Sequence, residues 1–255
     1  MENIAIEFKN VYKSYLISRF KYKRLSDDIS QIFQRLVTGK KRTIQSEKFL
    51  ALKNVNFNVK RGEGLGIIGK NGAGKTTILK LISKVTYPDS GEIKADGKIG
   101  AFIELGAGLH PELSGRENIY LYGAILGMKK KEVEEKFDDI VQFSGLRKFL
   151  DTPIKRYSSG MYARLGFSVV AFMDPDILLI DEVLAVGDKN FQEKCLVKMH
   201  KFAKSNKTLI FISHNLEAIK KMCSRVIVLD GGRILFQGNT EQAIKKYLDL
   251  FSKSR

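Results

Sequence analysis

A glycine-rich stretch at residues 69–76, which reads G-K-N-G-A-G-K-T, constrains this chain more than any other part of it. It fits the pattern G-x-x-x-x-G-K-[ST] at every fixed position, and its glycines let successive backbone N–H groups point into one concavity that holds phosphate oxygens. Residues 65–68 predict an apolar strand before the stretch, and residues 75–84 predict a helix after it. Because a helix N-terminus adds its dipole and free N–H groups to such a loop, the arrangement indicates a nucleoside triphosphate site.

The residues of this loop have separate expected roles. Lys75 is placed for the β- and γ-phosphates, and the hydroxyl of Thr76 is placed for Mg²⁺. Further nucleotide contacts are expected from the rest of the loop and the first turn of the helix, namely Gly69, Asn71, Gly72, Ala73, Gly74 and Thr77.

A second motif supplies the acidic side chains that a triphosphate site needs. Four apolar residues at 177–180 predict a buried strand, and Asp181 follows at its carboxyl end, where ligands bind in sheets of this kind. Because Mg²⁺ keeps several waters and takes few protein ligands, Thr76 and Asp181 form a reasonable set. Glu182 comes next and is suited to orient the attacking water or to take a proton from it.

Composition narrows the class of protein. The 255 residues are enough for one large domain or two small ones, and the sequence predicts neither a signal peptide nor a transmembrane helix. Cys195 and Cys223 fit no metal or redox spacing, which favours two reduced, partly buried thiols in a cytosolic protein. The formal net charge of +16 indicates an anionic neighbour, which on charge alone is nucleic acid, a membrane surface or an acidic substrate.

The order of the predicted elements indicates an α/β fold. Strands are expected in the first part of the chain at 4–8, 50–59, 92–94 and 98–103. From residue 177 onward strands alternate with helices, which predicts a parallel sheet flanked by helices. A helical block at roughly 115–173 interrupts this core, with helices expected at 117–127, 131–144 and 159–173.

One basic segment, residues 16–48, does not fit the core. It holds nine Lys or Arg residues against three acidic ones, and Ile29, Ile32, Phe33 and Leu36 fall on one helical face. The pattern is consistent with a solvated surface insertion. It is also consistent with an amphipathic helix that contacts a partner protein near anionic lipid headgroups.

Residues 156–161, which read R-Y-S-S-G-M, lie between the two phosphate-site motifs and lead into a predicted helix. They resemble the signature motif of ATP-binding-cassette (ABC) ATPases, usually L-S-G-G-Q, with Ser158 and Gly160 keeping the hydroxyl and the helix-start glycine. The resemblance implies a mixed sheet core, an antiparallel β subdomain and an inserted helical subdomain. It also implies that Ser158, Ser159 and Gly160 close on ATP held by the phosphate loop of a second copy, in a homodimer.

Other positions of the ABC pattern carry over to this sequence. His214 resembles the switch histidine that contacts the γ-phosphate, and Tyr15 resembles the aromatic residue that stacks on adenine, with Tyr12 as the other choice. Asp188 resembles the aspartate of the loop that passes between the two subunits. The glutamine that usually links Mg²⁺ to the membrane partner is missing at 103–106, where Glu104 is the nearest polar candidate.

The stretches 104–119, 157–161 and 181–188 resemble one branch of the family, the ATPase subunits that export O-antigen, capsule or wall teichoic acid. The basic insertion and Glu104 are also usual in that branch. The resemblance implies that two copies of this chain join two copies of a polytopic membrane subunit at the cytoplasmic face of a bacterial membrane. ATP hydrolysis would then drive a lipid-linked polysaccharide across the membrane, and an anionic leaflet would account for the charge of +16.

On this interpretation residues 1–255 form a single nucleotide-binding domain. Its parts are the basic insertion at 16–48 and the helical subdomain at 115–173, with no C-terminal carbohydrate-binding domain. Two alternatives are an ATPase subunit of an importer or lipid flippase, and a soluble ABC ATPase associated with nucleic acid. The missing glutamine and the Y-S-S-G-M signature argue against the first. One phosphate loop without extended heptads argues against the second, so no nucleic-acid partner is expected.

Overall fold

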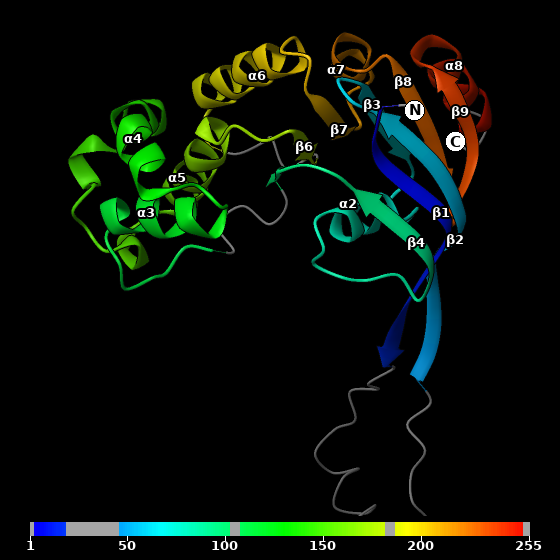
Figure 1. Ribbon diagram of the computed structural model, residues 1–255, viewed down its shortest axis with the longest axis horizontal. Helices are drawn as coiled ribbons and strands as arrows, with labels where there is room; N and C mark the ends of the chain where they lie inside the picture. Colours follow the sequence, from blue (N-terminus) through cyan, green and yellow to red (C-terminus); the bar gives the residue numbers. More distant parts are fainter. Residues whose placement is uncertain (1–2, 19–45, 103–107, 182–186, 252–255) are drawn as a thin grey trace, which may run out of the picture.

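The computed structural model describes residues 3–18, 46–102, 108–181 and 187–251. They form two sheets and a block of helices set to one side of them (Figure 1). Within these ranges no helix is both long enough and apolar enough to span a bilayer.

The larger sheet has six strands in the order β5-β6-β7-β3-β8-β9. Their bounds are β3 (Gly64–Gly69), β5 (Ile99–Phe102), β6 (Ile177–Ile180), β7 (Thr208–Ile212), β8 (Arg225–Asp230) and β9 (Arg233–Asn239). The first five run parallel and β9 pairs antiparallel with β8, so the sheet is mixed, as predicted. Every residue of β6 and β7 is buried, which fits strands covered on both faces.

Helices cover both faces of this sheet (Figure 1). On one face lie α6 (Lys189–Ala203), α7 (Leu216–Met222) and α8 (Thr240–Phe251), whose apolar residues share a core with Leu178, Phe211 and Val228. On the other face α2 (Lys75–Ile82) shares a core with Leu179, Ile210 and the second sheet. Alternate residues of a strand point to opposite faces, so each buried strand contributes side chains to the core on both faces of the sheet.

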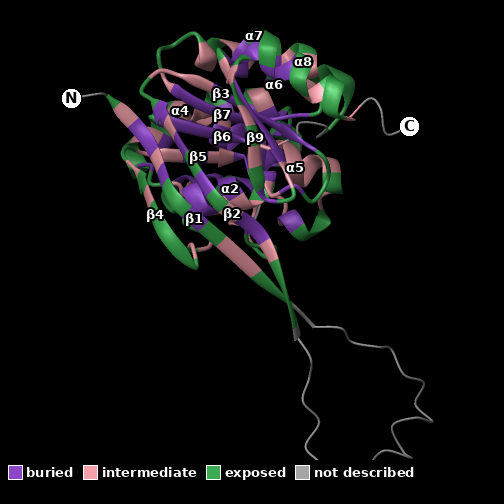
Figure 2. Ribbon diagram, turned by 90° about the vertical axis from the view of Figure 1, so that its right-hand side faces the viewer, coloured by how far each residue is buried: buried purple, intermediate pink, exposed green. Residues whose placement is uncertain are grey.

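The second sheet is antiparallel, with the order β2-β1-β4. Its strands are β1 (Ile4–Ser18), β2 (Ser46–Lys60) and β4 (Ser90–Ala95). The two long strands project away from the body of the molecule, and their outer ends, at 15–16 and 47–49, are exposed (Figure 2). At the start of the chain the sequence predicts a strand only at 4–8, which is shorter than the observed β1. Residues 16–18 and 46–48, which the sequence predicts to belong to the basic insertion, instead pair with each other and extend the hairpin. The helix expected around Ile29–Leu36 lies outside the described residues.

The middle of the chain forms the helical block of α3 (Gly115–Ile125), α4 (Lys130–Ser144) and α5 (Ser159–Phe172). These bounds agree with the predicted helices within a few residues. A reciprocal capping box starts α3: the Glu117 N–H donates to Ser114 Oγ, and the Ser114 N–H donates to the Glu117 carboxylate. Phe143 and Phe167 from this block stack or pack edge-on against Phe102 and Phe191, which joins the block to the core.

We expect Phe167→Ala to destabilise the protein by about 3–5 kcal/mol, because it empties a fully buried site at the centre of this aromatic cluster. Phe149→Ala, at a side chain that is 47% exposed, serves as the control and should change stability by less than about 0.5 kcal/mol. Urea unfolding followed by circular dichroism measures both values. Equal losses would contradict the role of the cluster.

Both cysteines are free and buried, as the sequence predicted. Burial raises the pKa of the Cys195 and Cys223 thiols to about 12, so each is protonated at neutral pH and is a poor nucleophile. We expect Ellman's reagent to label the native protein much more slowly than the protein unfolded in guanidinium. Fast labelling of both thiols in the native protein at pH 7.5 would contradict this burial.

Candidate functional site

The phosphate-loop sequence forms the predicted strand–loop–helix junction. β3 ends at Gly69 and α2 begins at Lys75. Gly74, at the N-cap of α2, has φ of 104°, and a Cβ there would lie 2.6 Å from the Ala51 carbonyl oxygen, so only glycine fits. No side chain among the described residues caps this helix. The backbone N–H groups at the start of α2 can therefore donate to a ligand, and a helix start of this kind binds anions.

The Lys75 side chain folds back over the loop that precedes it. Its Nζ donates hydrogen bonds to the carbonyl oxygens of Gly69, at 2.7 Å, and Lys70, at 3.0 Å. The side chain is only 8% exposed, so its charge is held beside the loop rather than in solvent. An ammonium in this position presents a fixed positive charge to an anion in the loop.

Asp181 and Thr76 meet, although they lie far apart in the sequence. The Thr76 Oγ1 hydroxyl donates to Asp181 Oδ2 at 3.0 Å, from the first turn of α2 to the end of β6. A hydroxyl and a carboxylate are hard oxygen donors, which Mg²⁺ prefers. The pair therefore fits the expected metal site, with Thr76 and Asp181 as the residues that would hold the ion.

His214 lies at the edge of the sheet where Asp181 and the phosphate loop also lie. It comes two residues after β7, which lies between β6 and β3, and its side chain is exposed. Because β6, β7 and β3 are parallel, Asp181, His214 and the phosphate loop all follow the carboxyl ends of neighbouring strands. This edge is where open α/β sheets bind ligands.

Tyr15 lies on β1, outside the larger sheet, and is 38% exposed, as is the alternative Tyr12. The neighbouring Ser14 anchors this part of the strand, because its N–H donates to Asp89 Oδ2 at 2.9 Å and its hydroxyl donates to the same carboxylate. These hydrogen bonds from Ser14 lower the pKa of Asp89, which is therefore charged at neutral pH. The Tyr15 ring itself is in contact with Lys13, whose Nζ lies 5.4 Å from the ring centroid.

The predicted signature residues start α5 and face solvent. Ser158 is the N-cap, and its Oγ accepts the Met161 N–H at 3.2 Å. A Cβ added to Gly160 would meet only Ser158 Oγ, at 3.9 Å, so the fold of one copy does not require glycine there. A glycine without an internal reason is typical of a position where another molecule approaches the backbone. In Figure 1 the helical block that holds α5 is set apart from α2 and its phosphate loop.

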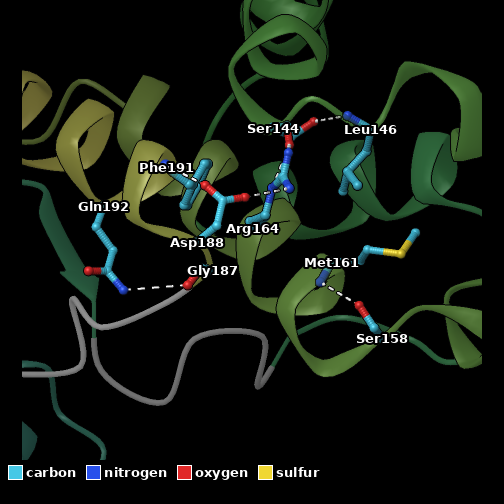
Figure 3. A network of polar contacts seen from close by, with 9 residues as sticks. All are labelled: Ser144, Leu146, Ser158, Met161, Arg164, Gly187, Asp188, Phe191 and Gln192. Atoms are coloured by element: carbon cyan, nitrogen blue, oxygen red, sulfur yellow. Dashed lines mark hydrogen bonds and ion pairs between the residues drawn. The ribbon is translucent and has the colours of Figure 1, made fainter.

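A residue that the sequence analysis missed connects this helix to Asp188 (Figure 3). Arg164 Nη2 and Nε donate to the Ser144 carbonyl oxygen at 2.6 and 2.9 Å, and Nη1 lies 3.5 Å from Asp188 Oδ2. Asp188 in turn caps α6 by accepting the Phe191 N–H at 2.9 Å. Arg164 is the only charged residue in the sequence of α5, which is the signal that could have identified it.

A second missed contact reaches the phosphate loop from the last helix. The Lys70 Nζ lies 4.6 Å from the ring centroid of Phe251, at the end of α8, in a cation–π contact. The Lys70 carbonyl is one of the acceptors of Lys75. The end of α8 thus supports the loop from outside.

Two candidate residues, Glu104 and Glu182, lie outside the described residues. Among the described candidates, the structure brings Lys75, Thr76 and Asp181 together and aligns His214 with them. Ser158, Ser159 and Gly160 lie on the separate helical block.

The sequence profile of the ABC transporter family matches residues 52–185. The O-antigen export system ATP-binding protein RfbB of Klebsiella pneumoniae is 43% identical over 246 residues, which cover 95% of this chain and 97% of that protein. The teichoic acids export ATP-binding protein TagH of Bacillus cereus is 40% identical over 96% of this chain and 42% of that longer protein.

Solved structures agree on the fold. A dimeric ATP-binding cassette in a post-hydrolysis state with ADP and Pi superposes with a TM-score of 0.70 at 23% identity, covering 92% of this chain and 98% of that one. An ATP-binding subunit of an ABC transporter gives a TM-score of 0.71 at 20% identity, covering 95% of this chain and 93% of that one. The chain belongs to the ABC transporter family and is an ABC-type ATPase.

We expect Asp188→Ala to lower the free energy of unfolding by about 1 kcal/mol, because it removes the cap of α6. Asp188→Asn keeps an oxygen that accepts the Phe191 N–H and loses only an exposed ion pair, so it should cost less than the Ala variant. Denaturant titration measures both. Equal losses for Asn and Ala would show that the cap is not the source of the stability.

Proposed function

We propose that this chain is the ATP-hydrolysing subunit of an exporter that moves a lipid-linked cell-surface polysaccharide across the cytoplasmic membrane. O-antigen, capsule and teichoic acid are the classes of polymer that fit. The proposal that the chain hydrolyses ATP rests on the 3.0 Å hydrogen bond between Thr76 and Asp181 beside the phosphate loop. Similarity over nearly the whole chain to proteins named for O-antigen and teichoic acid export supports the choice of polymer.

The proposed chemistry is phosphoryl transfer to water, which depends mainly on positioning and on charge neutralisation. Lys75 and the loop N–H groups neutralise phosphate charge. Thr76 and Asp181 would hold Mg²⁺, which would supply further positive charge at the phosphates. Glu182 orients the attacking water, and His214 contacts the γ-phosphate. Tyr15 stacks on the adenine. We assign the remaining phosphate contacts to the other loop residues expected from the sequence, namely Gly69, Asn71, Gly72, Ala73, Gly74 and Thr77.

We propose that the site is completed by a second copy of the chain. Ser158, Ser159 and Gly160 are accessible at the start of α5 and belong to a block apart from the phosphate loop of the same copy. The open space at Gly160 supports the approach of another molecule. A homodimer with two shared sites accounts for both observations.

The proposed assembly adds two copies of a polytopic membrane subunit at the cytoplasmic face. The projecting hairpin of β1 and β2 leads to the basic segment within 16–48, which we assign to the contact with that subunit and the anionic leaflet (Figure 2). Glu104 is assigned to the position next to the metal. We treat the chain as one nucleotide-binding domain with its helical subdomain at 115–173.

We expect Glu182→Gln to lower the rate of ATP hydrolysis at least about 100-fold, because the amide cannot take a proton from water. ATP binding should survive, so the variant should accumulate as an ATP-bound dimer in light-scattering chromatography. Glu241→Gln, at an exposed site on α8, is the matched control and should hydrolyse ATP normally. Unchanged hydrolysis in Glu182→Gln would remove Glu182 from the mechanism.

Export itself is tested in proteoliposomes that contain this chain and the proposed polytopic membrane subunit. We expect a lipid-linked polysaccharide to cross the bilayer when ATP is added on the side of this chain, and not with Glu182→Gln. ATP-dependent movement of a small solute in the opposite direction, with no movement of polymer, would identify an importer instead.

A further inference from the structure

A cavity of about 420 Å³ lies between the helical block and the core, beside Phe102 and Phe167 of the aromatic cluster. Its walls come from α4, the end of α5, the turn before β6, and α6. None of the residues assigned to the nucleotide site lines it. Its volume is in the range that holds small organic ligands.

The interior of this cavity is apolar. Ala171, Phe172 and Phe202 are the half-buried apolar residues of its lining. Met173, Met199 and Phe167 also line it and are buried. Such a surface accepts a hydrocarbon group, because burying apolar area releases water from both partners.

Cations dominate the polar part of the lining. Lys136 is paired with Glu132 at 3.1 Å, and Asp174 is paired with Lys207. The charged lining residues that remain are two cations, Lys198 and Lys201, and one carboxylate, Asp139. The lining therefore carries a surplus of positive charge after its own ion pairs are made.

Lys198 is the residue best placed to meet a ligand. Its Nζ lies 3.8 Å from the ring centroid of Phe172, over an apolar wall of the cavity. Burial lowers the pKa of this ammonium, and no carboxylate in the described part of the chain forms an ion pair with it. A half-buried ammonium without an ion-pair partner among the described residues gains from a bound anion, because the anion replaces part of its lost hydration.

We propose that this cavity binds a small amphiphilic anion, whose hydrocarbon chain lies against Ala171 and Phe202 and whose carboxylate or phosphate meets Lys198. The proposal concerns a site apart from the nucleotide and does not depend on the polymer that is exported. Because the walls belong to two parts of the molecule, a ligand there bridges α5 of the helical block and α6 of the core.

The methionines of the chain provide the test. Met173 and Met199 line the cavity, whereas Met128 and Met222 do not. With methionine methyl groups labelled by ¹³C, the full chain without nucleotide is titrated with decanoate, decyl phosphate or decanol, each below its micelle concentration. We expect the anions to shift the Met173 and Met199 signals saturably, and decanol to bind at least about tenfold more weakly, as expected for one charge-assisted contact.

Two variants and one control locate the two ends of the ligand. Lys198→Met keeps the apolar stem and should bind decanoate no better than decanol. Ala171→Phe keeps Lys198 but fills the cavity and should abolish both sets of shifts. Lys194→Met, one turn earlier on α6 and outside this lining, should bind as the wild type does.

The anion that binds more tightly, decanoate or decyl phosphate, distinguishes a carboxylate from a phosphate ligand, and either result supports the site. Equal affinity for decanol and decanoate would overturn the role of Lys198. Shifts of Met128 and Met222 that parallel those of Met173 and Met199 would show non-specific detergent binding and would overturn the site itself.

Discussion

The structure depends on one constraint, the burial of the central strands on both faces. Strands β6, β7 and β3 are buried almost throughout and run parallel, so their carboxyl ends lie along one edge. The phosphate loop, Asp181 and His214 each follow one of these ends. The hydrogen bond between Thr76 and Asp181 is a direct consequence, since it joins the helix after one strand to the end of another.

The same molecule presents a second set of polar groups on the helical block. The start of α5 faces solvent, and Arg164 connects that helix to α4 through Ser144 and to the N-cap of α6 through Asp188. Asp188 follows β6 by a short segment of the sequence, so Arg164 links α5 to the part of the chain that comes after this strand.

The sequence alone predicted those features that depend on neighbouring residues. The loop at 69–76, the strand before Asp181 and the helices at 130–144 and 159–172 follow from local spacing and apolar periodicity. The length of the hairpin could not be predicted, because register shifts around Val11, next to Asn10 with its positive φ, interrupt the alternation that marks a strand.

Long-range contacts were the other limit of the sequence analysis. Arg164 with Ser144, and Lys70 with Phe251, are pairs from distant parts of the chain with no sequence motif of their own. The pairing of Thr76 with Asp181 was expected only because the two motifs occur together in nucleotide sites. The packing of Phe102, Phe143, Phe167 and Phe191 into one cluster likewise became visible only in three dimensions.

The central claim is that each nucleotide site is shared between two copies. It is tested most directly by mixing two inactive variants, Lys75→Ala and Gly160→Glu, the second at a position with room for a side chain. A mixed dimer would contain one site with both an intact phosphate loop and an intact signature. The account predicts that the mixture hydrolyses ATP although neither variant does so alone. A mixture as inactive as its components would contradict a shared site.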